Sequence, residues 1–450
     1  MTPFKLTDEL LEEIRQLIAE NKDFELQAMM KEFHYADIAE IADELEVEGA
    51  TYLIKLLDSE KTSDILAEMH EDIREAVLKN LTAKEIAGEL SELDTDDAAD
   101  IINELPRELV QEVISEIADR EHAKDIVDLL RYEDNSAGGL MAKELVKVNE
   151  NWTVTTCVKE MRAQAENVTR VHSIYVVDDE GKLKGRLSLK DLLTASTKTH
   201  IKDVYISKVD AVNVNEKGEE VAKIMSKYDL EAIPVVDEIG RLVGRITIDD
   251  IVDVIREEAD KDYQMAAGIS QDVEVSDSIW ILTRARIPWL ILGLFGGLGA
   301  AAIMGTFEDM ISKHAVLFFF TPLIAAMAGN VGVQSSAIVV QGLANDDLKG
   351  SVRNHLFKEM LLALLNGFIL AVLLLLFTWI WKGDFATALA ISLSLVVVIV
   401  VAGFIGTFIP LFLHKRNIDP AIATGPFITT SNDIFGILIY FWIAKIILGI

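Results

Sequence analysis

Long stretches without a charged residue constrain this chain most, and they fill its C-terminal part. They cover residues 287–307, 315–345, 360–381 and 385–413, and a fifth apolar stretch covers 420–450. The fifth is interrupted only by Asp433 and Lys445. A helix needs roughly 20 apolar residues to cross the hydrocarbon core of a bilayer. The pattern therefore predicts a membrane domain of five helices over residues 284–450.

The charge distribution divides the chain into two parts. From Asp277 onward there are nine acidic and ten basic residues, so the first 276 residues carry a net charge of −32. A strongly acidic part is thus joined to a nearly neutral, apolar one. A disordered chain or a simple soluble enzyme does not fit this pattern. We also expect no nucleic-acid partner, because phosphate backbones repel an acidic surface.

Basic residues next to the spans predict the orientation. If the residues before Arg284 are inside, seven basic residues flank the inner side and three the outer side. Since inner loops are enriched in Lys and Arg, we expect a multi-pass protein of the cell (inner) membrane, with a cytoplasmic N-terminus and an outer C-terminus. The start of the sequence predicts no cleavable signal peptide. The single cysteine, Cys157, excludes an intrachain disulfide.

Two predicted spans carry polar groups that lipid cannot satisfy. In the second span, Asn330 and Gln334 lie four residues apart and share one helix face, with Gly332 between them. We expect them to line a pore; the alternative is helix packing through small residues. In the fifth span, Asp433 costs about 2.5–3.5 kcal/mol at mid-membrane. It predicts an ion or proton path, or a protonated side chain bonded to a neighbouring helix.

The region 1–134 is predicted to be an acidic all-helical domain built on a repeat. Residues 57–69 match residues 93–105 at an offset of 36. Each copy places an Asp-Ser or Asp-Thr pair where a helix N-cap belongs, with acids in the first turn that favour the helix dipole. Stacked helical hairpins are the physical interpretation. The acids Asp96 and Asp100 are most simply dipole-favoured surface residues.

A second duplication joins residues 174–193 to 233–252 at an offset of 59. Each copy predicts a strand, an Asp-x-x-Gly turn, a strand and a helix. This pattern resembles the cystathionine-β-synthase-type (CBS) domain pair, predicted over 135–199 and 200–258. Such pairs are regulatory modules that often bind adenine nucleotides. The resemblance places ribose-contacting groups at Ser188 and Asp191 in the first copy, and at Thr247 and Asp250 in the second. The alternative is that each pair only caps its helix.

A charged helix follows the second copy. It begins near Asp249, carries clustered acids, and is predicted to run on as a connecting (plug) helix over 259–283 toward the first span. Like charges spaced three or four residues apart repel one another. The cluster therefore needs counter-ions.

The order of these parts resembles the MgtE family of magnesium transporters and channels, over essentially the whole chain. The motifs that carry the resemblance are Leu93-Asp-Thr-Asp-Asp-Ala-Ala-Asp, Ser136-Ala-Gly-Gly-Leu-Met, Gly329-Asn-Val-Gly-Val-Gln and Asp419-Pro-Ala, followed by Asp433. The resemblance implies a homodimer whose second and fifth spans line one pore. It implies that Asp433 holds the permeating Mg²⁺, with Asn330, Gly332, Gln334 and Thr429 lining the pore.

The family also binds regulatory Mg²⁺ between the helical domain, the CBS pair and the connecting helix. The matching positions are Asp96, Asp100, Glu219, Asp229, Asp250, Asp253, Glu258 and Asp419. The sequence departs from the family near Lys261, where one carboxylate is lost. It departs again at Gly425 and Pro426, where relatives can carry a polar side chain.

The expected function is Mg²⁺ entry through a channel or transporter that high cytoplasmic Mg²⁺ closes. Mg²⁺ prefers oxygen ligands and gives up its waters reluctantly, whereas a zinc or copper site would need a histidine or thiolate cluster. No phosphate-binding loop motif is present, and no enzyme activity is expected. The resemblance to CBS pairs makes ATP a candidate ligand of residues 135–258. The alternatives are a proton- or sodium-coupled divalent metal transporter and a membrane-anchored nucleotide sensor.

Overall fold

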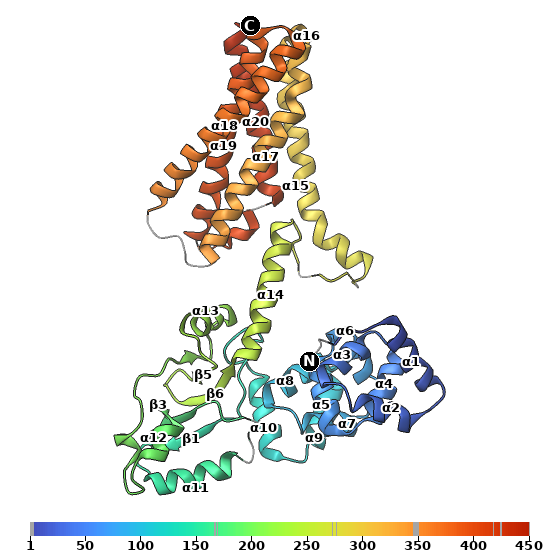
Figure 1. The fold of residues 1–450 in the computed structure, drawn as a ribbon, viewed down its shortest axis with the longest axis vertical. Helices are drawn as coiled ribbons and strands as arrows, with labels where there is room; N and C mark the ends of the chain where they lie inside the picture. Colours follow the sequence, from blue (N-terminus) through green and yellow to red (C-terminus); the bar gives the residue numbers. More distant parts are fainter. Residues whose placement is uncertain are drawn as a thin grey trace. The chain divides into compact units, whose positions relative to one another are not determined.

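The computed structural model describes the chain in ranges separated by short gaps (Figure 1). The described residues are 4–165, 168, 170–271, 273–275, 277–344, 351–416, 418–423 and 425–449. They form two compact units, Met1–Ile255 and Arg256–Ile450. The predicted end points Asn345 and Ile450 of two spans lie outside the described residues.

The first unit opens with a helical domain, as predicted. Its helices are α1 (Asp8–Ala19), α2 (Asp23–Met30), α3 (Tyr35–Asp43), α4 (Val47–Leu56), α5 (Ser59–Glu68), α6 (Glu71–Leu78), α7 (Ala83–Leu90), α8 (Thr95–Glu104), α9 (Arg107–Glu116) and α10 (Arg120–Leu129). The repeat is visible in α5 and α8, which are both ten residues long and begin 36 residues apart. Asp58 and Asp94 occupy the N-cap positions, but neither side chain makes a capping hydrogen bond. The carboxylate of Asp94 accepts a hydrogen bond from Arg245 instead.

The CBS pair follows, and its duplication is also confirmed. The first copy holds β1 (Val146–Asn149), α11 (Val154–Ala165), β2 (Ile174–Val177), β3 (Leu183–Leu187), α12 (Leu189–Thr194) and the 3-10 turn η1 (Ile201–Asp203). The second holds β4 (Val212–Asn213), α13 (Gly218–Tyr228), β5 (Ala232–Val236) and β6 (Leu242–Thr247). Among the described residues each copy forms one sheet, in the order β1-β2-β3 or β4-β5-β6, with a parallel pair and then an antiparallel hairpin. Gly181 and Gly240 turn the two hairpins at φ +81° and +83°, which a side chain would resist.

The helical domain and the second CBS copy share a hydrophobic core. Ile102 and Ile126 of the helical domain belong to the same buried cluster as Val235 and Ile251 of the second copy, whereas the first copy has a cluster of its own around Val176. Burial of apolar area is the main stabilising term in folding. Hence the helical domain is held against the second copy.

The second unit contains long apolar helices, and Figure 1 shows α17 to α20 running side by side. Five of the described helices are long and apolar enough to cross a membrane: α15 (Ile279–Thr306), α17 (Ala315–Ala344), α18 (Val352–Lys382), α19 (Phe385–His414) and α20 (Gly425–Leu448). The five predicted spans all have a counterpart. The short helix α16 (Glu308–Lys313) joins the first two, and the 3-10 turn η2 (Pro420–Ala423) precedes α20.

The connecting helix is shorter than predicted. Helix α14 (Ile248–Ala266) ends before a loop, and α15 begins only at Ile279, so the region 259–283 is not one helix. Gly268 lies in the left-handed region at φ +82°, where a glycine commonly stops a helix. The Ser270 hydroxyl then donates to the carbonyl of Ala285 at 2.8 Å, which ties the loop to α15.

Glycines bring the membrane helices into close contact. A Cβ on Gly296 of α15 would overlap Thr430 of α20. A Cβ on Gly425 would overlap the carbonyl oxygen of Ala266, and one on Gly268 would overlap the Pro426 ring. The end of α14 therefore meets the start of α20 in direct backbone contact.

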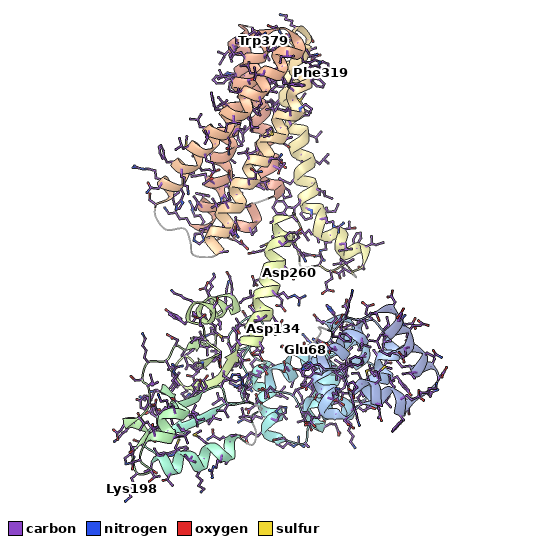
Figure 2. The ribbon with its side chains drawn as sticks, in the orientation of Figure 1. Glu68, Asp134, Lys198, Asp260, Phe319 and Trp379 are labelled. Carbon is purple, nitrogen blue, oxygen red and sulfur yellow. The ribbon has the colours of Figure 1, made fainter. Side chains whose placement is uncertain are left out.

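Figure 2 labels Phe319 and Trp379 at one end of the bundle, and the rings of Trp379 and Trp381 lie beside those of Phe385 and Phe377. The Lys382 ammonium lies 3.8 Å from the ring centre of Trp381 and 6.0 Å from that of Phe319. Aromatic and lysine side chains favour the border between lipid and water. This end is thus suited to a membrane interface.

Candidate functional site

A cavity of about 360 Å³ lies between α17 and α20. It is lined by Ala325, Ala326, Gly329, Asn330, Val333, Gln334, Thr429 and Asp433. The structure thus brings together four of the sequence-predicted pore residues: Asn330, Gln334, Thr429 and Asp433. Two of them come from each helix. The two members of each pair both reach the cavity, because residues four positions apart share a helix face.

Gly329 sets the geometry around Asp433. The glycine is buried, and a Cβ there would lie 3.3 Å from the Thr429 methyl group and 4.0 Å from Oδ1 of Asp433. The Thr429 hydroxyl donates to the carbonyl of Gly425 at 3.0 Å, one turn earlier in α20. One half-buried carboxylate therefore stands among neutral oxygen groups, in a space large enough for a cation that keeps part of its water shell.

Gly332 lies elsewhere, contrary to its prediction as a pore-lining residue. It is buried where α17 crosses α19 and α20, and a Cβ there would overlap the Asn432 amide. The carbonyl of Gly332 packs on Gly406. Gly332 is thus a packing residue that permits this helix crossing.

A second candidate site lies within the first unit, at the start of α8. Carboxylate oxygens of Asp94, Asp96 and Glu144 all lie within 4.8 Å of one another, and all three residues are partly buried. Hard cations such as Mg²⁺ and Ca²⁺ bind oxygen groups of this kind. The arrangement can hold one divalent cation.

Hydrogen bonds hold this cluster between the helical domain and the CBS pair. The Thr95 hydroxyl donates to Glu144 at 2.9 Å and accepts from the backbone of Lys143 at 2.9 Å. The buried guanidinium of Arg245 donates to Asp94 at 3.2 Å and to the carbonyl of Glu144. Because Arg245 is 5 % exposed, its ion pair with Asp94 is shielded from water.

Neighbouring carboxylates have raised pKa values. Burial, followed by the charge of Asp97, raises the pKa of Asp96 well above its usual range. Burial, with the nearby charge of Asp250, raises the pKa of Asp97 to about 7. Burial and the charge of Asp134 (labelled in Figure 2) raise that of Asp100 to about 7. Burial also raises the pKa of Asp250 to about 6, although hydrogen bonds from Thr247 lower it. Burial and mutual repulsion therefore oppose the simultaneous ionisation of these four carboxyl groups.

The predicted regulatory residues do not all belong to this cluster. Asp96 belongs to it, and the charge of Asp250 contributes to the raised pKa values of both Asp96 and Asp100. Asp253 raises the pKa of Glu68, after the larger effect of burial. The other four predicted residues neither belong to the cluster nor appear among the charges that act on it. Glu219 is exposed and paired with Lys223 at 2.8 Å, Asp229 is an exposed C-cap of α13, and Glu258 and Asp419 belong to the second unit. There Glu258 pairs with Lys261 at 3.2 Å, and Asp419 accepts from the backbone of Ala421 at 2.8 Å.

The two predicted ribose-binding pairs differ. Thr247 donates to Asp250 through its hydroxyl at 2.7 Å and its backbone at 3.1 Å. The cap interpretation thus accounts for the geometry of this pair. Ser188 is the N-cap of α12 without a side-chain capping bond, and Asp191 lies in the first turn.

Sequence reasoning missed Asp94, Glu144 and Arg245 as parts of the acidic site, since Asp94 was predicted only as a helix N-cap. Glu144 lies in a segment without a motif. Arg245 stands in the Gly-Arg pair that both copies repeat, which was the one available signal. Their contacts join residues 49 to 151 positions apart, and no local pattern encodes such pairs.

Comparisons with known proteins agree on the family. The family model for the MgtE divalent cation transporter matches residues 321–443, that for the MgtE intracellular N domain 33–135, and that for the CBS domain 137–198 and 201–257. The magnesium transporter MgtE of Bacillus subtilis is 32% identical over 97% of this chain and 97% of its own length. That of Thermus thermophilus is 32% identical over 98% and 99%.

A solved structure supports the fold of the first unit. It is the cytosolic domain of the Mg²⁺ channel MgtE in complex with ATP, with 34% identity and a TM-score of 0.50. The match covers 54% of this chain and 99% of that one. Together with relatives that match over nearly their whole length, this likeness shows that the chain belongs to the MgtE family of magnesium transporters.

Proposed function

We propose that this chain mediates Mg²⁺ entry across the cell membrane through a pore that passes Asp433. The observation that carries the proposal is the cavity between α17 and α20, where one carboxylate stands among Asn330, Gln334 and Thr429. An inside-negative potential contributes about 2.3 kcal/mol per charge per 100 mV, and about twice that for a divalent cation. Passive entry thus needs no chemical energy source. The relatives that match nearly the whole chain are magnesium transporters, and no catalytic activity is expected.

The pore is proposed to form between two copies of the chain. Among the described residues, the cavity is lined by α17 and α20 alone, so one chain supplies a single carboxylate. A second copy would add a second Asp433 and complete the wall. The cytoplasmic N-terminus and the outer C-terminus follow from the distribution of basic residues. Cross-linking in membranes, with a single cysteine introduced in the Cys157→Ala background, tests the dimer.

Closure by cytoplasmic Mg²⁺ is the proposed regulation. The cluster of Asp94, Asp96 and Glu144 lies where the helical domain meets the CBS pair, next to carboxylates with raised pKa values. Bound cations would remove the repulsion and favour the compact state, a ligand-driven shift between two states. Glu258 and Asp419 are proposed to act in the same way near the membrane. The CBS pair is a candidate site for ATP, since the similar solved structure is a complex with ATP.

Mg²⁺ uptake into proteoliposomes tests the proposal. The wild type and Asp433→Asn are compared at low and high Mg²⁺ on the cytoplasmic face. Uptake that needs Asp433 and stops at high cytoplasmic Mg²⁺ would support the pore and its regulation. Uptake that follows an imposed proton or sodium gradient with fixed stoichiometry would favour a coupled transporter. Uptake by Asp433→Asn at the wild-type rate would refute the pore.

A further inference from the structure

Glu359 is a carboxylic acid in the membrane unit that the proposed pathway does not use. It lies in α18, at the start of the apolar sequence that begins with Met360. The hydroxyl of Ser335 donates to Oε1 of Glu359 at 2.5 Å. Ser335 belongs to α17 and is only 3% exposed. A short hydrogen bond thus joins α18 to the helix that lines the cavity.

Three helices meet at this hydrogen bond. A Cβ on Gly403 of α19 would lie 3.7 Å from Oε1 of Glu359 and 3.7 Å from the Ser335 hydroxyl. The same Cβ would lie 3.2 Å from Ala363, one turn after Glu359 in α18. Gly403 therefore lies in van der Waals range of the bonded pair, and the lack of a side chain there lets α19 pack closely on Ala363 of α18.

The hydrogen bond lies directly behind the cavity wall. Ser335 follows Gln334, which lines the cavity together with Asn330. Because both residues belong to one helix, a rotation of α17 that broke the bond at Ser335 would also change the direction in which Gln334 faces. The glycine contact at Gly332 sets how closely α17 approaches its neighbours. A hydrogen bond is directional, and this one favours a single rotation of α17.

We propose that Glu359 is a positioning residue for ion passage, which acts through Ser335 to fix the rotation of α17 and so the placement of Gln334 and Asn330. This inference rests on the proposed pore. A hydrogen bond restricts both the distance and the angle between donor and acceptor. Its loss lets α17 rotate, so the polar side chains meet the cation less often in the productive arrangement.

Four single variants and one double variant separate positioning from general loss of structure. Ser335→Ala removes the donor and Glu359→Met removes the acceptor at similar length, while Glu359→Gln keeps an acceptor oxygen. Ser336→Ala is the matched control, because the neighbouring Ser336 hydroxyl is buried and has no hydrogen-bond partner among the described residues. The double variant of Ser335→Ala with Glu359→Met measures the coupling between the two residues.

The assay is Mg²⁺ uptake into proteoliposomes over a range of Mg²⁺ concentrations. Ser335→Ala and Glu359→Met should each lower uptake at sub-saturating Mg²⁺ by about tenfold and raise the half-saturating concentration. The double variant should be no worse than either single one. Glu359→Gln should stay within about threefold of the wild type, since it keeps the acceptor, and Ser336→Ala should match the wild type.

Three results would overturn this role. Additive losses in the double variant would mean that the residues act independently. A Glu359→Gln variant as poor as Glu359→Met, beside a normal Ser335→Ala, would mean that the charge itself is needed. A fall in maximum uptake alone, at an unchanged half-saturating concentration, would mean that only the amount of folded protein changed. Asp433→Asn, run in parallel, reports separately on the pore.

Discussion

Raising the pH should strengthen Mg²⁺ binding to the carboxylates of the first unit that surround the start of α8, namely the cluster of Asp94, Asp96 and Glu144 with its neighbours Asp97 and Asp100. We call this group the acidic face. Burial and neighbouring charges raise the pKa values of Asp97 and Asp100 to about 7. Carboxylates bind metal ions only after they lose their protons. Protons and Mg²⁺ therefore compete for this face near neutral pH, whereas ordinary aspartates with a pKa near 4 would be fully ionised there.

The magnitude follows from these pKa values. A carboxyl with a pKa of about 7 is about one-tenth ionised at pH 6 and about nine-tenths ionised at pH 8. The half-saturating Mg²⁺ concentration should therefore fall about tenfold over this range for each such carboxyl that must lose a proton on binding. Without Mg²⁺, a rise in pH has the opposite effect and destabilises the folded first unit. Because the folded-state pKa values are raised, their contribution to stability is present below pH 4 and is lost as the pH rises toward 7.

Limited proteolysis of the full-length protein in detergent measures this competition. Mg²⁺ is titrated at pH 6, 7 and 8, and the midpoint of protection of the cytoplasmic part is recorded. Asp97→Asn should show a weaker pH dependence, because one titrating group is gone. Asp237→Asn, at an exposed hairpin with a lowered pKa, should keep the wild-type dependence. A midpoint that is the same at pH 6 and pH 8 would refute the reasoning.

Three further predictions concern packing and burial. Gly332→Ala should lower the free energy of unfolding by about 1–3 kcal/mol through overpacking and so lower the Tm in detergent. Gly297→Ala is the control, because its Cβ would meet nothing within 4 Å. Equal Tm values for the two variants would contradict the helix crossing at Gly332. Arg245→Met leaves Asp94 without its buried ion pair and should destabilise the first unit by about 3–5 kcal/mol, as measured by urea unfolding. Arg241→Met removes a guanidinium that is 55 % exposed and paired with Asp237, and it should cost less than about 1 kcal/mol. Similar losses in both variants would count against the shielding of Arg245. Cys157 is buried, and its pKa is raised to about 11. Thiol reagents should therefore label the native protein about 100-fold more slowly than the unfolded chain. Similar labelling rates would mean that the first CBS copy is open.

The sequence predicted what depends on local periodicity. The ten-residue helices α5 and α8 and the two hairpins followed from repeats that the chain shows twice, and the membrane helices followed from charge-free length. Gly332 was assigned to the wrong face, although two residues along a helix turn the side chain by about 200°. The helix rule that grouped Asn330 with Gln334 already excluded it. Glu144, Arg245 and the link from Ser335 to Glu359 could not be predicted, because they depend on how separate elements pack.

The backbone contact between the end of α14 and the start of α20 has a mechanical consequence. Side chains between two helices act as soft spacers, since their rotamers can change when one helix moves. At Gly425 and Gly268 no such spacer exists, and the carbonyl of Ala266 and the Pro426 ring occupy the space directly. A displacement of the end of α14 therefore presses directly on the start of α20, and Thr429 and Asp433 lie one and two turns further along that helix.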